Sequence, residues 1–159
     1  MAGVKDVVTG VVYTKNIERA LIPAGVDGPL GDSVIVSGLV YRAPDLTGAP
    51  VGTVDFVSIT TSIGEVTERR QVSIEVSFNK RFARRSWIAE LDGPLKKPKQ
   101  SAGVSLTGVE TYPLGGGIPD RPLTFGVSAG TGPFIGAEGT ASIVYNQETE
   151  SFTYRFSLI

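Results

Sequence analysis

Few side chains in this sequence could do chemistry, because histidine and cysteine are both absent from its 159 residues. Their absence excludes Ser-His-Asp catalysis, His-ligated zinc, a thiol nucleophile and disulfides. Any catalysis must then use carboxylates, lysine, arginine, tyrosine or amide side chains, or shape alone. Asn16 is the first candidate, since it follows a hydrophobic strand and could donate a hydrogen bond to a substrate carbonyl. Its alternative role is to fix the turn that begins after it.

Further candidates stand on segments whose composition is typical of strands. Ser58 has the same strand parity as Phe56, so it would be a polar group on a largely apolar wall. Tyr13 and Trp87 could shape a binding cavity, although packing in an ordinary core is the simpler interpretation. Glu90 is the best carboxylate on these segments, and a solvated outer face is the simpler place for it.

Four glycines between residues 130 and 139 surround Phe134. Part of this segment reads G-x-G and could form a phosphate-binding loop, but such a loop needs a helix after it. Residues 140–145 are instead typical of a strand. Glycine is needed where φ is positive or where no Cβ fits. The segment therefore indicates a sharp corner that leads into a terminal hairpin and closes a sheet.

Charged residues give no sign of a bound ion. Basic side chains gather on both sides of Trp87, at 80–85 and at 96–99. Such a cluster could attract an anionic substrate, or it could be the solvated end of a hairpin. Asp27 and Asp32 lie near glycines, but their spacing lacks the ligand pattern of a calcium loop. We expect no metal and no other cofactor.

Short β-branched runs separated by turn residues predict an all-β barrel or sandwich. The chain holds 20 glycines and 10 prolines, which punctuate it throughout. Residues 71–79 alternate most regularly between apolar and polar side chains, which is typical of an antiparallel sheet with one buried face. The expected strands are 7–14, 33–41, 51–61, 71–79, 86–91, 123–128, 140–145 and 151–159.

Two segments fit the strand pattern poorly. Residues 17–22 could form one helical turn before Pro23 forces a loop. Residues 96–122 are rich in glycine and proline and would form an irregular insertion, with at most a short strand at 103–112. A long loop of this kind can be a lid over a binding site, and a plain surface insertion is an equal alternative.

Length and composition limit the organisation and the partners. A chain of this length can bury a substantial core, so we expect a single domain over 1–159. The net charge of −1 gives no indication of a nucleic-acid partner. No segment approaches the roughly 18 apolar residues of a membrane helix, and the first residues lack the pattern of a signal peptide. We therefore expect a cytoplasmic protein without nucleic-acid or membrane partners.

The glycine corner at 130–139 resembles the G-G/T-G-x-F-x-G-A-x-G sequence shared by plant dirigent proteins and allene oxide cyclases. Weaker matches follow the family order along the chain, at residues 12–16, 31–34, 51–53 and 91–94. The first of these, Val-Tyr-Thr-Lys-Asn, is similar to the first strand of allene oxide cyclases. The chain thus resembles the allene oxide cyclase and dirigent barrel superfamily over nearly its whole length.

This resemblance implies an eight-stranded antiparallel β-barrel with a hydrophobic lumen, often assembled as a homo-oligomer, either a trimer or a dimer. Bacterial members of this superfamily include spirotetronate-forming Diels-Alderase-like cyclases. These fold a long polyene tetronate in the lumen for a [4+2] ring closure. The resemblance therefore implies a small, hydrophobic substrate for this chain.

The resemblance also assigns positions to the family's functional residues. The catalytic glutamate in the first strand of allene oxide cyclases corresponds to Thr14, so that carboxylate is missing here. Asn16 matches the asparagine two residues later, and Pro23 matches the proline of the following loop. A second lumen asparagine falls at Gly38, and a lumen cysteine falls near Ser58. Because most of these polar residues are replaced, we do not expect allene oxide cyclase activity.

We expect a cofactor-independent cyclase or isomerase that folds a small, largely apolar natural-product intermediate in the lumen for ring closure. Holding a flexible chain in a reactive fold can recover about 7–11 kcal/mol of the barrier. A hydrogen bond that strengthens in the transition state would add to this. The alternatives are a dirigent-like protein that orients a reactive intermediate made elsewhere, and a plain small-molecule-binding barrel. The expected catalytic residues are Asn16, Ser58 and Tyr13, and the expected substrate-binding residues are Thr14, Pro23, Phe56, Trp87 and Glu90.

Overall fold

The computed structural model describes residues 8–25, 28, 30–78, 102–114, 118–119, 121–131 and 134–159. Within these residues the chain is all-β, and eight antiparallel strands close into one barrel. Both features confirm the expectation from the sequence. The strands are β1 (Val8–Ile22), β2 (Ser33–Tyr41), β3 (Gly52–Ile63), β4 (Thr67–Phe78), β5 (Ala102–Pro113), β6 (Leu123–Thr131), β7 (Gly139–Asn146) and β8 (Ser151–Leu158).

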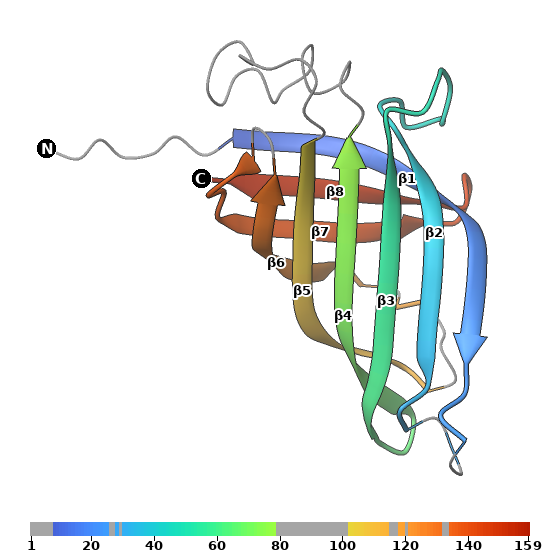
Figure 1. Ribbon diagram of the computed structural model, residues 1–159. Coiled ribbons are helices and arrows are strands. Elements are labelled where there is room, and N and C mark those ends of the chain that lie inside the picture. Colours follow the sequence, from blue (N-terminus) through green and yellow to red (C-terminus); the bar gives the residue numbers. More distant parts are fainter. Residues whose placement is uncertain are drawn as a thin grey trace, which may run out of the picture.

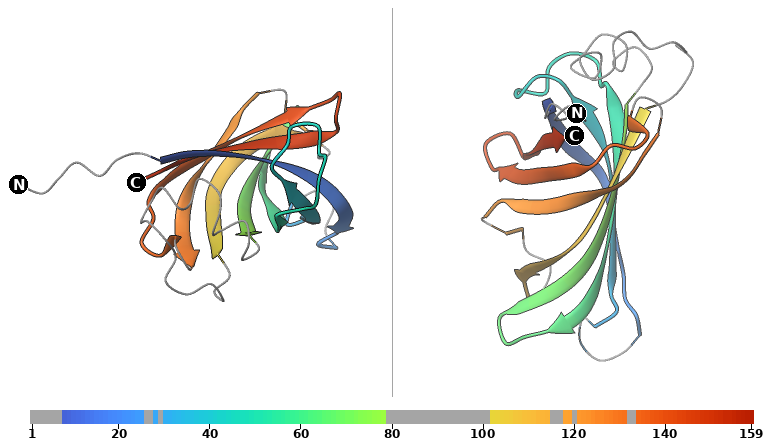
Figure 2. Two further views of the ribbon diagram at one scale, coloured as in Figure 1. Left: turned by 90° about the horizontal axis from the view of Figure 1, so that it is seen from above. Right: turned by 90° about the vertical axis from the view of Figure 1, so that its left-hand side faces the viewer.

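Each strand pairs with the next along the chain, and β8 pairs with β1 to close the barrel. Strands β2 to β5 stand side by side in Figure 1, while β7 and β8 cross them at a steep angle. β1 belongs to both groups because it bends: residues 8–14 pair with β8, and residues 13–22 pair with β2. The sheet therefore curls around on itself, as the views from above and from the side in Figure 2 show.

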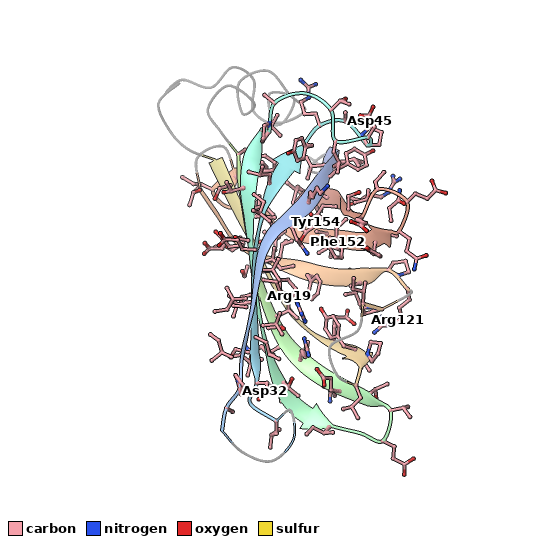
Figure 3. All side chains as sticks on the ribbon, turned by 90° about the vertical axis from the view of Figure 1, so that its right-hand side faces the viewer. Arg19, Asp32, Asp45, Arg121, Phe152 and Tyr154 are labelled. Atoms are coloured by element: carbon pink, nitrogen blue, oxygen red, sulfur yellow. The ribbon has the colours of Figure 1, made fainter. Side chains whose placement is uncertain are left out.

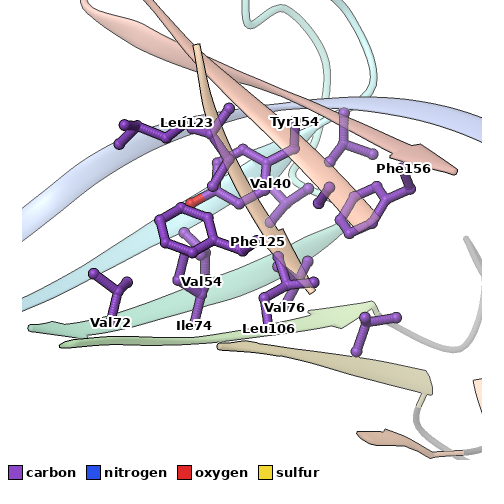
Figure 4. Packing of buried hydrophobic residues seen from close by; sticks show 14 of the residues in the cluster. Val40, Val54, Val72, Ile74, Val76, Leu106, Leu123, Phe125, Tyr154 and Phe156 are labelled. Atoms are coloured by element: carbon purple, nitrogen blue, oxygen red, sulfur yellow. The ribbon is translucent and has the colours of Figure 1, made fainter. Parts of the chain in front are cut away.

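Side-chain alternation decides which residues enter the barrel. Every second residue of β4 is buried, from Glu68 to Phe78, because successive side chains of a strand point to opposite faces. Inward side chains from all eight strands form one core, part of which is drawn in Figure 4 with Val40, Leu106 and Phe125 among its members. Burying such an apolar side chain contributes about 1.5–3 kcal/mol relative to leaving it exposed.

The described part of the predicted glycine corner leads into β7 and places Phe134 in the core. Phe134 is fully buried there, and its ring lies 5.8 Å from the ring of Phe78, centre to centre. Gly130 allows this arrangement, because a Cβ at that position would lie 2.0 Å from the Phe134 carbonyl oxygen. Gly139 has a φ of +136°, a backbone conformation that residues other than glycine rarely adopt.

One expectation from the sequence was wrong. Residues 17–22 do not form a helical turn, since they continue β1 with a β-bulge between Asn16 and Glu18. The short strand allowed at 103–112 is β5, which is one residue longer at each end and pairs with β4 along its whole length. The strand expected at 86–91 lies outside the described residues. No helix among the described residues is long and apolar enough to cross a membrane.

Candidate functional site

The barrel encloses a cavity of about 500 Å³, which is within the size range of small-molecule sites. Most of its wall is aliphatic or aromatic, with three arginines and one amide among the polar groups. Arg19, Arg121, Phe152 and Tyr154 are labelled in Figure 3 on the concave side of the sheet. The lining residues are Asn16, Arg19, Val34, Val36, Val54, Phe56, Arg70, Tyr112, Ile118, Pro119, Arg121, Leu123, Phe125, Ile143, Tyr145, Phe152 and Tyr154.

The cavity opens where β1 runs past the start of β8. Thr14 pairs with Phe152 at the last register position shared by these two strands. Asn16 and Arg19 follow on β1, beyond the reach of β8, so both line the cavity and both are exposed to solvent. We call this end of the barrel the mouth. It is the end at which β1, β3, β5 and β7 finish and the other four strands begin.

The β-bulge in β1 decides which charged residue enters the cavity. Strict alternation from Asn16 would point Glu18 inward. The extra residue at Ile17 shifts the register, so that Arg19 pairs with inward-facing Val36, and Glu18 pairs with Ser37. A bulge commonly re-aims side chains in this way beside a functional site. The mouth therefore carries a cation from β1 in place of a carboxylate.

A buried ion pair stands on the wall formed by β3, β4 and β5. The Arg70 guanidinium donates from Nε to Glu68 Oε1 and also pairs with that oxygen through Nη2. Thr60 Oγ1 donates to the same carboxylate oxygen over 3.3 Å, and Arg70 Nη1 donates to Ser58 Oγ over 3.4 Å. The side chains of Arg70 and Glu68 are 7% and 0% exposed. Burial without these partners would be costly for either charge.

Arg70 has N–H donors that the described residues do not use and that a ligand in the cavity could bind. A guanidinium has five N–H donors, and the bonds to Glu68 and Ser58 engage three of them. The remaining two have no partner among the described residues. The guanidinium carbon also lies 5.4 Å from the ring centre of Tyr112, within the range of a cation–π contact. Arg70 is thus a fixed cation with donors available to a ligand.

Two phenols beside the cavity stay protonated at neutral pH. Burial raises the pKa of Tyr112 to about 12, and the nearby Arg70 cation partly opposes that rise. Burial also raises the pKa of Tyr154 well above its usual range, with the Tyr112 phenol adding to the effect. The Tyr112 hydroxyl is buried and has no hydrogen-bond partner among the described residues. It can therefore act as a neutral donor or acceptor toward a ligand.

The charges of the described residues at the mouth do not cancel. Arg121 Nη2 donates to Glu110 Oε2 and to the Thr111 carbonyl oxygen, both over 3.1 Å. Arg19 forms no ion pair or hydrogen bond with another described residue. Among the described residues, carboxylates thus neutralise Arg70 and Arg121, and none pairs with Arg19. No group of three acidic side chains within the described part of the chain is placed to hold a metal ion.

The predicted site residues separate into four groups. Asn16 and Phe56 line the cavity. Thr14 and Ser58 lie on the inward faces of the same two strands, β1 and β3. Each is 1% exposed, and neither lines the cavity. Tyr13 lies between two inward residues of β1 and so faces outward, and Pro23 is exposed in the loop after β1. Trp87 and Glu90, like the basic cluster around them, lie outside the described residues.

Sequence reasoning missed the arginines and carboxylates of the cavity. Arg70 and Glu68 could have been found, because they continue the inward parity of Val72 and Ile74 toward the start of β4. Arg19 gave no such signal, since its inward position depends on the bulge. Tyr112 was noted only as the end of a short strand, which the structure extends to Pro113.

Neither a protein-family model nor a curated protein matches the chain by sequence. Solved structures match it by fold. Pyocyanin demethylase gives a TM-score of 0.68 at 15% identity, covering 96% of this chain and 100% of that chain. The pterocarpan synthase dirigent protein PsPTS1 gives 0.61 at 15% identity, covering 97% and 94%. AbnU, an exo-specific intermolecular Diels-Alderase, gives 0.60 at 10% identity, covering 96% and 98%.

These matches confirm the resemblance seen in the sequence at the level of the fold. The chain has the barrel architecture found in a dirigent protein, in a Diels-Alderase and in a demethylase. Because identities are so low, the chemistry of this chain must be argued from the residues that line its own cavity.

Proposed function

We propose that this protein is a cofactor-independent cyclase or isomerase that folds a small, largely apolar molecule in the barrel lumen for ring closure. The observation that carries the proposal is the cavity of about 500 Å³, which combines an apolar wall with hydrogen-bond donors held by fixed partners. Apolar walls with a few placed polar groups are typical of sites that orient a substrate.

The wall would act by restricting the shape of the substrate. In an intramolecular ring closure every bond is made and broken within one molecule, so no atom or electron is gained or lost. Phe56, Phe125 and Phe152 can hold a flexible chain so that its reacting carbons meet. Such positioning can lower a barrier by about 7–11 kcal/mol.

Arg70 would stabilise charge that develops on a substrate carbonyl oxygen. Its guanidinium cannot rotate away, because Glu68 and Ser58 hold it from two sides. Donors fixed before the reaction need no reorganisation during it, and one such donor is worth about 2.7–4 kcal/mol in other enzymes. Asn16, which lines the cavity from β1, remains a second candidate donor.

Proton-transfer chemistry receives less support from this cavity. A general base needs a carboxylate or amine free to accept a proton. Among the described residues, the carboxylates at the cavity are Glu68 and Glu110, and both are engaged by arginines. A hydrolytic role therefore fits these residues less well than ring closure does.

The test is turnover of a linear polyene that carries a diene, a dienophile and an activating carbonyl. The purified protein alone should convert it to a product of the same mass, with loss of the diene absorbance. Val36→Phe would narrow the cavity and should abolish turnover, because Val36 lines it. Val57→Phe, on the outer face of the neighbouring strand, is the matched control and should keep turnover. Equal turnover by both variants would contradict a reaction in the lumen.

A dirigent-like role is the second candidate, favoured by the shared barrel of the pterocarpan synthase dirigent protein. In that case the lumen would orient an intermediate that a separate oxidase generates. The assay separates the two roles. Product formed without any oxidase supports the cyclase, whereas a change only in the stereochemistry of an oxidase-generated product supports the dirigent role.

A further inference from the structure

Arg19 stands out among the charged residues of the cavity because no carboxylate of the described residues pairs with it. Its side chain lines the cavity on β1 and is exposed at the mouth. Within the described part of the chain it makes no ion pair and no hydrogen bond. The other two cavity arginines each have a carboxylate partner, Glu68 for Arg70 and Glu110 for Arg121. Among the described residues, these three cations and two carboxylates leave a formal charge of 3 − 2 = +1.

The bulge at Ile17 places a second polar group beside Arg19. Without the extra residue, Asn16 and Glu18 would share the inward face. With it, Asn16 and Arg19 share that face, and both line the cavity. An arginine and an amide supply several N–H donors in a small area. This combination suits a group with two acceptor oxygens and a negative charge.

The cavity becomes apolar with distance from the mouth. Phe125, Ile143 and Tyr154 line it and are 1%, 6% and 4% exposed. Asn16 and Arg19, by contrast, are in contact with solvent. A molecule bound along this gradient would place an apolar part inside and a charged end at the mouth, because burying an unpaired charge is far more costly than burying hydrocarbon.

We propose that Arg19 and Asn16 bind an anionic oxygen group of the carboxylate type at the mouth, so that the substrate is an acid with an apolar body. This inference rests on the proposed function, since it assumes that the lumen is the binding site. The inference adds that the substrate carries a negative charge at one end and that its apolar end enters the cavity first. Arg70, which is buried in the wall of the same cavity, remains available to a second oxygen of the same molecule.

The test compares three probes of equal chain length by isothermal titration calorimetry at neutral pH. Decanoate carries a carboxylate, 1-decanol a neutral hydroxyl, and decylammonium a positive charge. A hydrogen bond to a charged group contributes about 1.5–3 kcal/mol, and 1.4 kcal/mol is a tenfold change in Kd. We expect decanoate to bind at least about tenfold more tightly than 1-decanol, and decylammonium to bind most weakly.

Arg19→Gln should remove the preference for decanoate over 1-decanol. Arg69→Gln is the matched control, because Arg69 lies on the outer face of β4. This substitution changes the net charge by the same amount as Arg19→Gln. It should keep the preference. Equal losses in Arg19→Gln and Arg69→Gln would mean that overall charge attracts the probe, and would overturn the anion site.

The double variant Glu18→Arg/Arg19→Glu provides a sharper test. It keeps the composition and net charge but exchanges the residues that face inward and outward. We expect its preference to reverse, so that decylammonium binds more tightly than decanoate. An unchanged preference would overturn the role of Arg19.

The two proposals can fail separately in this experiment. If decanoate and 1-decanol bind the wild-type protein equally, the anion site is overturned and the lumen function stands. If none of the three probes binds, or if Val36→Phe leaves their binding unchanged, the lumen function itself is overturned.

Discussion

Glu68 and Arg70 lie two residues apart on the inward face of β4, and their side chains form an ion pair inside the barrel. This spacing brings them together because alternate residues of a strand share one face. The pair is shielded from solvent at 0% and 7% side-chain exposure. It therefore fixes a guanidinium at the wall of an otherwise apolar cavity.

Glu68→Gln should destabilise the protein strongly. The substitution keeps the size of the side chain and leaves the Arg70 charge buried without a carboxylate. Removing one partner of a buried ion pair costs about 3–5 kcal/mol. The measurement is the free energy of unfolding from urea titration. A loss below about 1 kcal/mol would show that Arg70 finds other compensation.

Replacing both members of this pair should separate stability from function. Glu68→Leu/Arg70→Met removes both charges and should recover most of the lost stability, because apolar replacement of a buried pair is often neutral or stabilising. It should still lose turnover.

Glu110→Gln breaks the ion pair with Arg121, whose side chain is 49% exposed. That control should cost no more than about 1 kcal/mol.

Stability should fall at high pH because of the buried phenols. Burial raises the pKa of Tyr112 to about 12, whereas an unfolded chain has a tyrosine pKa of about 10. The folded state thus holds this proton when the unfolded state has lost it. The contribution is fully present below pH 10 and is lost as the pH rises toward 12.

The measurement is the urea concentration at the midpoint of unfolding, determined at a series of pH values from 8 to 12. Tyr112→Phe should reduce the fall, and it should not weaken the protein at neutral pH, because the Tyr112 hydroxyl has no partner there. Tyr13→Phe removes a phenol from the outer face and serves as the control. A fall of the same size in all three proteins would contradict the assignment to Tyr112.

The barrel was predictable from sequence where local signals agree. β2 runs over 33–41 as expected, because a β-branched run there is bounded by Gly31 on one side and Pro44 on the other. β5 was underestimated, since Gly103 and Gly108 weaken its local pattern. It is a full strand because it pairs with β4 from Ala102 to Pro113, and pairing between distant segments leaves little trace in a single sequence.

The cavity was predictable only in part, for a similar reason. Asn16 and Phe56 were found because a strand pattern or the family resemblance pointed to them. Arg19 was missed because its face depends on a bulge that forms where β1 bends from β8 toward β2. Nothing local distinguishes Glu18 from Arg19 as the inward residue, and a shift of one residue reverses every assignment.

The glycine corner beside Phe134 should not tolerate a side chain at Gly130. A Cβ there would lie 2.0 Å from the Phe134 carbonyl oxygen, a backbone atom that cannot move alone. We expect Gly130→Ala to cost several kcal/mol in the free energy of unfolding, on the order of other overpacked sites. Gly126→Ala is the control, since its Cβ would meet its nearest neighbour at 4.0 Å. Equal stability of the two variants would contradict this account of the corner.

Thr14→Val tests whether the position that resembles a catalytic glutamate still has a role. The Thr14 hydroxyl is buried beside the Tyr154 phenol without a well-formed hydrogen bond among the described residues. Removing an unsatisfied hydroxyl at constant shape should leave the protein equally stable or more stable by about 1 kcal/mol. Thr14 does not line the cavity, so decanoate affinity and turnover should also be unchanged. Phe56→Ala, which opens the lining itself, should weaken both. A clear fall in turnover for Thr14→Val at full stability would return Thr14 to the substrate-binding residues.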